Sequence, residues 1–195
     1  MRTVAAGFAA LALAALAACG SPTPTATPYT NADWGFAATF PGAPKVTETP
    51  KSATSAHSLL VQASVGDEDM AINVIDATDA EGMPSEILDR AQQVIGKDQD
   101  LDVGSNTPVQ LNGGSITGRE VRFDKDGKPV MLSRLYMING HLYELNANSA
   151  KGVGDPWVKQ FLDSFHLVAS PQIGEPPAAP TNAPSNAAPA NAAGH

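Results

Sequence analysis

The sequence contains a single cysteine, Cys19, in 195 residues. A chain with one thiol cannot form an internal disulfide, although an exported protein could have used one. It also cannot supply the several thiolates of a structural zinc site. If Cys19 is itself modified, no thiol remains as a catalytic nucleophile.

Positive charge is also scarce. The chain has 12 lysines and arginines against 20 aspartates and glutamates, a formal net charge of -8. This balance argues against nucleic acid or an anionic lipid surface as a direct partner. Of the acidic residues, 11 lie between Asp67 and Asp102, where only Arg90 and Lys97 oppose them. We therefore expect one acidic face on an otherwise balanced surface.

The residue patterns of common catalytic and metal sites are missing. The chain has no Gly-x-Ser-x-Gly elbow, and Gly113 and Gly114 lack the spacing of a phosphate loop. No two histidines stand four residues apart, the spacing that would direct both imidazoles to one metal. We therefore expect no metal, no cofactor and no enzymatic activity, with His141 exposed after a turn. The four histidines are His57, His141, His166 and His195.

One acidic stretch has part of the pattern of a calcium loop. Asp98, Asp100 and Asp102 precede Gly104 at alternating positions. An EF-hand needs glycine at position six and glutamate at position twelve, and this chain has valine at both. The favoured interpretation is a solvated acidic loop at a helix end, and weak calcium binding is the alternative.

The N-terminus has the pattern of an export signal. A basic residue, Arg2, precedes an apolar run from Val4 to Ala18. A helix of about fifteen residues is about 22 Å long, which is short of the roughly 30 Å hydrocarbon layer of a bilayer. A permanent transmembrane anchor is therefore the weaker interpretation.

The end of this run resembles the lipobox of bacterial lipoproteins, with Leu16 three residues before Cys19. The resemblance implies cleavage after Ala18 and attachment of lipid, including palmitate-type chains, to the sulfur of Cys19. Two or three acyl chains hold a protein at a membrane where one binds only marginally. An ordinary secretory signal is the alternative. Gly20 and Ser21 lack the aspartate that retains such lipoproteins in the inner membrane, so we expect the outer membrane, facing the periplasm, if the source has two membranes.

Composition divides the mature chain into three parts. Residues 19–28 alternate proline with small polar residues and predict an extended tether. Residues 170–195 are rich in proline, alanine and asparagine, and we expect a disordered tail because they have little apolar surface to bury. Residues 29–169 are long enough for one globular domain with a single core.

Alternating apolar residues predict that strands dominate this domain. A polar turn at Asp67, Glu68 and Asp69 is expected to join two strands in a hairpin. Asn139 and Gly140 suit a type I′ turn, which needs positive φ at both positions, within a three-stranded antiparallel meander. The expected strands are 35–40, 58–65, 70–75, 109–111, 116–123, 129–138 and 141–147.

Two amphipathic helices are predicted between these strands. The first follows Pro84 and is expected to stop at Gly96, and the second begins with Asp155 as N-cap and Pro156. Because each helix has only one apolar face, both should lie on a sheet, which gives an α+β domain with an antiparallel sheet of five to seven strands. The apolar faces consist of Ile87, Leu88, Ala91, Val94 and Ile95, and of Val158, Phe161, Leu162 and Phe165.

Several short segments together resemble small exported bacterial domains of the PsbP-like family, named for an accessory protein of the photosystem II oxygen-evolving complex. The resemblance implies an antiparallel sheet sandwiched by helices and a non-enzymatic accessory or binding role, and it implies no catalytic residues. The matching residues are Gly35, Phe36, Phe40, Pro41, Gly42, Ala43, Pro44, Gly118, Arg119, Glu120, Arg134, Leu135, Tyr136, Leu142, Tyr143, Phe161, Leu162, Asp163, Ser164 and Phe165.

The aromatic residues are expected to pack in the core. The alternative is a ligand pocket between the C-terminal helix and the meander, in which Arg119, Arg122 and Arg134 face an anion. Cross-strand charge pairing explains these arginines as well. The aromatic residues concerned are Trp34, Phe36, Phe40, Tyr136, Tyr143, Trp157 and Phe165.

Taken together, the sequence predicts a lipid-anchored envelope protein that is not an enzyme and that binds another protein or a small ligand. The alternatives are a hydrolase with a dispersed active site and a structural protein of the cell wall. A cleft holding a buried carboxylate or imidazole beside a hydroxyl would favour the hydrolase, and a solvated apolar patch would favour binding.

Overall fold

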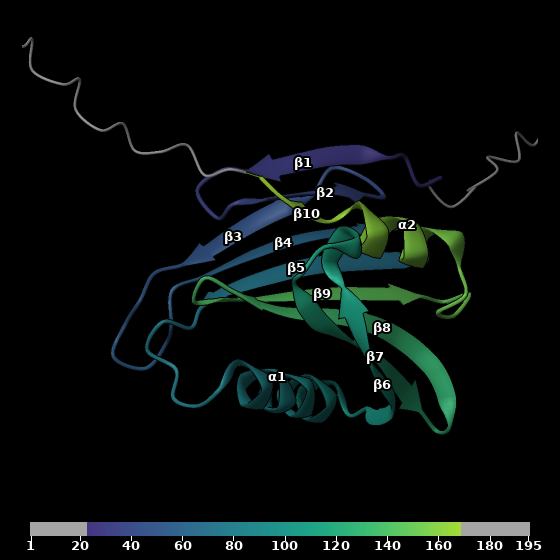
Figure 1. Ribbon diagram of the computed structural model, residues 1–195. Helices are drawn as coiled ribbons and strands as arrows, with labels where there is room; N and C mark the ends of the chain where they lie inside the picture. Colours follow the sequence, from purple (N-terminus) through teal and green to yellow (C-terminus); the bar gives the residue numbers. More distant parts are fainter. Residues whose placement is uncertain (1–22, 169–195) are drawn as a thin grey trace, which may run out of the picture.

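The computed structural model describes residues 23–168 (Figure 1). The predicted signal peptide, the cleavage site between Ala18 and Cys19, the lipidation site and the tail from residue 170 lie outside these residues. Within them, no helix is both long and apolar enough to cross a bilayer.

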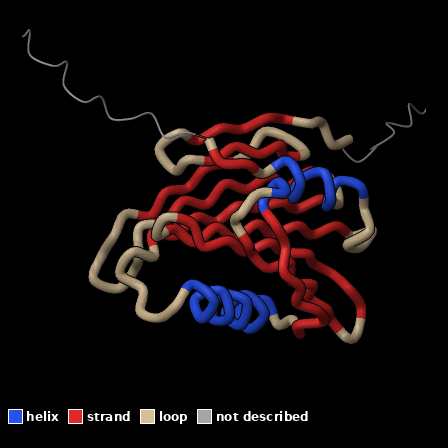
Figure 2. Tube along the Cα trace, in the orientation of Figure 1, coloured by secondary structure: helices blue, strands red, loops and turns tan. Residues whose placement is uncertain are grey.

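The domain is α+β, as predicted, and its two sheets are antiparallel (Figures 1 and 2). A seven-stranded sheet has the order β3-β4-β5-β9-β8-β7-β6, and a small sheet has the order β1-β2-β10. The elements are β1 Thr27–Asn31, β2 Phe36–Phe40, β3 Lys45–Thr49, β4 Ser58–Val65, β5 Glu68–Asp76, α1 Pro84–Gln99, β6 Asp102–Gln110, the 3-10 turn Leu111–Gly113, β7 Thr117–Lys125, β8 Lys128–Ile138, β9 His141–Ser149, α2 Pro156–Ser164 and β10 His166–Leu167.

The predicted hairpin and meander are both present. Strand β4 pairs with β5, and β7, β8 and β9 pair in sequence. Asn139 and Gly140 have φ of 49° and 82°, the positive values that a type I′ turn needs. The turns therefore fix the register in which the side chains of each strand alternate between the two faces of the large sheet.

The two faces of the large sheet support separate cores. On one face, α2 and the small sheet cover a cluster that contains Phe36, Phe40, Phe161 and Phe165, each 0% exposed. On the other face, α1 packs over Val121 and Phe123, among other residues. Figure 1 shows α1 below the sheet and α2 with the small sheet above it, which is the expected sandwich.

Helix α1 differs from its prediction in two ways. It continues through Gly96 to Gln99 and ends where Asp100 takes a left-handed φ of 55°. Gly96 is a packing residue, because an added Cβ would lie 3.0 Å from the Leu101 carbonyl and 3.4 Å from the Phe123 ring. Val94, which was expected on the buried face, is 55% exposed.

The sequence did not predict the strands that bury little. β3 is exposed throughout, and β6 is exposed at all but one residue, so neither shows an apolar alternation. β6 runs from Asp102 and ends before Leu111, whereas the expected strand covered only 109–111. β1 begins at Thr27, so the last two residues of the expected tether already pair with β2.

A candidate ligand groove beside helix α1

Helix α1 leaves part of its sheet face open. The helix packs most closely on β6, β7 and β8, and Leu142 of β9 belongs to the same cluster, whereas β4 and β5 contribute no fully buried residue to it. Two cavities of about 530 and 540 Å³ lie in this space, and both are lined by Ile75, Val94 and Glu144. Because they share these three residues, we treat them as one site and call it the α1 groove.

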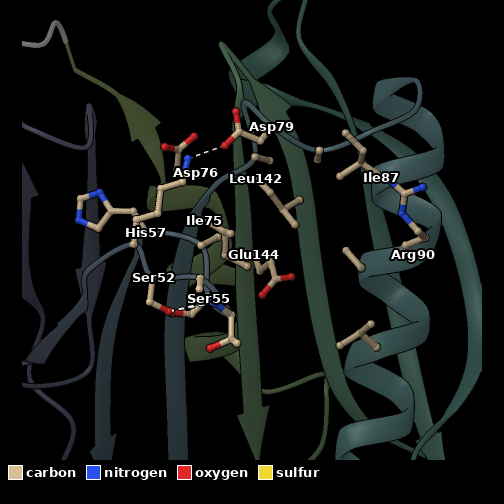
Figure 3. Close-up of a pocket in the computed structure, with 18 residues that line it drawn as sticks. Ser52, Ser55, His57, Ile75, Asp76, Asp79, Ile87, Arg90, Leu142 and Glu144 are labelled. Atoms are coloured by element: carbon tan, nitrogen blue, oxygen red, sulfur yellow. Dashed lines mark hydrogen bonds and ion pairs between the residues drawn. The ribbon is translucent and has the colours of Figure 1, made fainter.

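The first half of the α1 groove lies between the start of α1 and the loop of residues 51–57. Its walls include Ile87, Ala91 and Leu142. Lys51 forms an ion pair with Asp79 at the rim, and this hydrogen bond raises the pKa of Lys51. In Figure 3, Ile87 on α1 and Leu142 on β9 lie at the opening, Asp79 lies at its edge, and Glu144 on β9 points towards the helix. This half combines an apolar interior with a charged edge.

The second half of the α1 groove runs along the open sheet face and is more polar. Its charged residues are Asp69, Asp98 and Glu144, and no lysine or arginine lines it. Hydroxyl and amide side chains supply most of the remaining polar groups. They are Thr47, Thr49, Ser58, Gln62, Asn73, Gln99, Asn146 and Asn148.

Glu144 stands where the two halves meet, and it is only 9% exposed. Its Oε2 accepts a hydrogen bond of 2.8 Å from Asn73 Nδ2. No described residue hydrogen-bonds to its Oε1, and no described cation pairs with it. Burial raises the pKa of Glu144, and the hydrogen bond from Asn73 opposes this shift. The Oε1 atom is not fully buried, so solvent or a ligand in the groove can reach it.

A hydrolase was expected to show a cleft with a buried carboxylate or imidazole beside a hydroxyl, and the α1 groove meets this condition only in part. It holds a buried carboxylate, but the group hydrogen-bonded to Glu144 is an amide and not a hydroxyl or an imidazole. The nearby hydroxyls of Ser52 and Ser55 bond to each other at 2.6 Å. His57 Nε2 lies 2.7 Å from Glu48 Oε1. Neither of these serine hydroxyls is therefore hydrogen-bonded to a base, whereas the hydroxyls of Ser64 and Thr78 donate to the carboxylates of Asp69 and Asp76.

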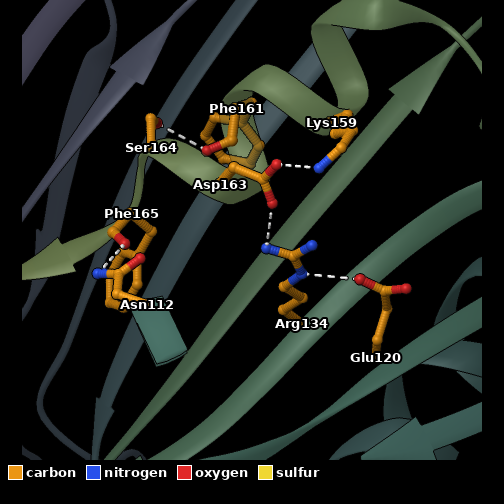
Figure 4. Close-up of polar contacts among 8 residues, drawn as sticks. All are labelled: Asn112, Glu120, Arg134, Lys159, Phe161, Asp163, Ser164 and Phe165. Carbon is orange, nitrogen blue, oxygen red and sulfur yellow. Dashed lines mark hydrogen bonds and ion pairs between the residues drawn. The ribbon is translucent and has the colours of Figure 1, made fainter. Parts of the chain in front are cut away.

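The alternative of a pocket between α2 and the meander gains no support, because no residue of α2 lines any of the five main cavities among residues 23–168. Arg134 instead bonds to Glu120 Oε2 and to Asp163 Oδ1, each at 2.8 Å (Figure 4). Arg119 pairs with Asp89, and Arg122 pairs with Asp124. Since carboxylates hold all three guanidinium groups, charge pairing explains these arginines. The aromatic residues pack in or against the core, as predicted.

Two of the four histidines lie around one tryptophan. The Trp34 ring centroid is 4.7 Å from that of His57 and 5.5 Å from that of His141. His141 is half-buried, which contradicts the expected exposure. No group of three His, Cys, Asp or Glu side chains within residues 23–168 could hold a metal ion.

Two acidic stretches have different outcomes. Asp98 lies in the last turn of α1, Asp100 is the C-cap of that helix, and Asp102 is the first residue of β6. The three carboxylates are therefore not arranged in a calcium-binding loop. Glu68 was expected in a solvated turn but is 1% exposed, because it is the first residue of β5 and points into the protein. Its Oε1 lies 3.3 Å from Lys151 Nζ, and its Oε2 has no partner among the described residues.

Sequence reasoning missed the α1 groove because it treated strand polarity as simple solvent exposure. In β9 the residues Tyr143, Leu145 and Ala147 face the α2 core, whereas Glu144 and Asn146 face the groove. The sequence signal for this groove was a set of polar residues at alternate positions of the neighbouring strands β5 and β9, on the sheet face that α1 covers only in part.

Comparisons with known proteins support the fold. No protein-family model and no curated protein matches the chain. The solution structure of cyanobacterial PsbP from Synechocystis sp. PCC 6803 superposes with a TM-score of 0.51 at 12% identity, covering 80% of this chain and 98% of that one. Protein PA94 from Pseudomonas aeruginosa gives a TM-score of 0.29 at 12% identity, over 66% of this chain and 85% of that one. The first comparison shows that the domain has a PsbP-like fold, and the similarity to PA94 is too low to indicate a shared fold.

Proposed function

We propose that this protein is a lipid-anchored lipoprotein of the cell envelope whose domain is a non-enzymatic binding module, with the α1 groove as the binding site. The observation that carries the proposal is Glu144. A buried carboxylate without a cation costs stability, so a domain selected only for stability gains nothing from it. A ligand that contacts Glu144 explains why the groove is open and why its base is charged.

The PsbP-like fold supports an accessory role, because the sequence resemblance to that family implies binding and no catalytic residues. A hydrolase is the weaker alternative. It requires a hydroxyl beside the buried carboxylate of Glu144, and the group bonded to this carboxylate is the amide of Asn73.

A neutral fluorescent probe tests whether the α1 groove binds ligands. The protein is the full mature chain with Cys19→Ser, so that no lipid competes, and the probe is N-phenylnaphthylamine. Val94→Trp places an indole in the groove, and Val103→Trp is the matched control, because Val103 is 46% exposed on β6 and does not line the groove. We expect the first variant to bind the probe at least tenfold more weakly than the second. Equal affinity of the two variants would refute the groove as the site.

A separate experiment tests the anchor. The lipobox resemblance at Leu16 to Cys19 implies that the unmodified precursor gains acyl chains on the sulfur of Cys19. The exported wild-type chain should enter the detergent phase and carry the mass of the lipid, and Cys19→Ser should lose both properties. Identical partitioning of the two proteins would disprove lipid anchoring. Fractionation of an intact envelope with two membranes should place the wild-type chain in the outer membrane.

A further inference from the structure

The buried carboxylates of the domain differ in whether a lysine or arginine lies beside them. Glu68 is 1% exposed, and Lys151 lies 3.3 Å from it, so a lysine of the chain offsets its charge. Glu144 is 9% exposed and has no lysine or arginine partner among the described residues. Asp155 is 6% exposed and lies 3.6 Å from the same lysine. The domain therefore provides a cation for two of its three described buried carboxylates and leaves the third, Glu144, facing the α1 groove.

The two halves of the groove differ in charge. The polar half contains Asp69 and Asp98 and no cationic side chain. Asp69 accepts hydrogen bonds only from the neutral groups of Gln62 and Ser64, and Asp98 has no ion pair among the described residues. This half therefore attracts positive charge.

The other half of the groove suits a hydrocarbon chain. Ile75, Ile87, Ala91, Val94 and Leu142 line it on both sides, and its cavity is about 530 Å³. The lysine of this half is paired with Asp79, and its arginine, Arg90, donates to the Glu81 carbonyl. Asp76 accepts from the backbone and the hydroxyl of Thr78, which lowers its pKa. Apart from Glu144, the charged groups named at this end thus already have partners within the chain.

We infer that the ligand of the α1 groove is an amphiphilic amine, with its ammonium on Glu144 Oε1 and its alkyl chain between α1 and β5. This inference rests on the proposed function and specifies its ligand class. An ammonium donates to the carboxylate oxygen that lacks a partner and offsets the charge, while the methylene groups bury apolar surface. A metal ion fits less well, because it needs several oxygen ligands and no group of three His, Cys, Asp or Glu side chains among residues 23–168 could hold one.

Competition against N-phenylnaphthylamine tests the inference. The competitors are n-octylamine, 1-octanol and octanoate, which share a chain length and differ in head-group charge. At pH 7.5 we expect octylamine to displace the probe from the wild-type groove at a concentration at least tenfold below that of octanol, and octanoate to be the weakest. Glu144→Gln should bring octylamine and octanol to equal potency. Asp100→Asn, a matched change at a 95% exposed carboxylate outside the groove, should behave like the wild type.

The outcomes separate this inference from the proposed function. If the probe binds and Val94→Trp abolishes binding, but octylamine and octanol compete equally in the wild type, the amine is refuted and the groove stands. If the probe does not bind, the proposed function fails first. Probe binding by Glu144→Gln also shows that this variant is folded. Dihexanoylphosphatidylethanolamine in the same assay distinguishes the sources of the amine: competition that depends on Glu144 identifies a lipid head group, and competition by octylamine alone identifies a free amine.

Discussion

Gly118 on β7 lies under the ring of Tyr136, and replacing it with alanine should disrupt the core. A Cβ at this position would lie 2.3 Å from Tyr136 Cδ1 and 2.4 Å from the Leu135 carbonyl oxygen. The ring cannot move aside easily, because Tyr136 is 1% exposed and stacks on Phe165 with 6.0 Å between ring centroids. Leu135 O belongs to the backbone of β8, so relief there would distort a central strand.

Overpacking of this kind costs about 1–3 kcal/mol, and the backbone contact places Gly118→Ala near 3 kcal/mol. In a domain of this size that corresponds to a decrease in Tm of roughly 6–12 °C. Gly154→Ala is the control, because its Cβ would meet no atom within 4 Å and its φ is not positive. Urea denaturation of both variants gives the comparison. A difference of less than about 0.5 kcal/mol between them would refute the argument that Tyr136 requires a glycine beneath its ring.

Three further changes test the fold and the groove. Because burial raises the pKa of Glu144, the unfolding free energy of the wild type should fall as pH rises through the folded-state pKa of this residue. Glu144→Gln should therefore have a higher Tm than the wild type at pH 7 and the same Tm near pH 4. A lower Tm of the variant at pH 7 would contradict this. Asp155→Ala removes the N-cap bond to Trp157 N and should cost about 0.5–2 kcal/mol at pH 7. That bond lowers the pKa of Asp155, so the cost measured in urea should shrink as pH falls through the folded-state pKa, and a constant cost would exclude the ionised cap. Phe161→Ala empties a site that is 0% exposed and in contact with Phe40, so it should cost about 3–5 kcal/mol, and a loss below 1 kcal/mol would show that this core is not tightly packed.

The sequence predicted the elements whose patterns arise locally. Asn139 and Gly140 define a turn by their own backbone preferences, and Asp155 followed by Pro156 defines a helix start. The strands β4 and β8 alternate apolar and polar residues strongly enough to be recognised without their neighbours. These features require no knowledge of the tertiary fold.

The features that the sequence did not predict depend on distant parts of the chain. β3 and β6 are stabilised by backbone pairing with a single neighbour, which leaves no apolar pattern. Gly96 continues a helix because Phe123 packs against it from β7. Glu144 is buried because α1, some fifty residues earlier, passes above one side of β9 and not the other. In each case the local structure or burial depends on a neighbouring element and not on the intrinsic preference of the residue itself.

The first and last described strands, β1 and β10, both pair with β2 in the small sheet. That sheet belongs to the α2 core, on the opposite side of the domain from α1. A membrane attachment preceding Thr27 would therefore pull on one side of the domain, while the mouth of the groove opens on the other. In that arrangement the bilayer would not cover the groove at Glu144.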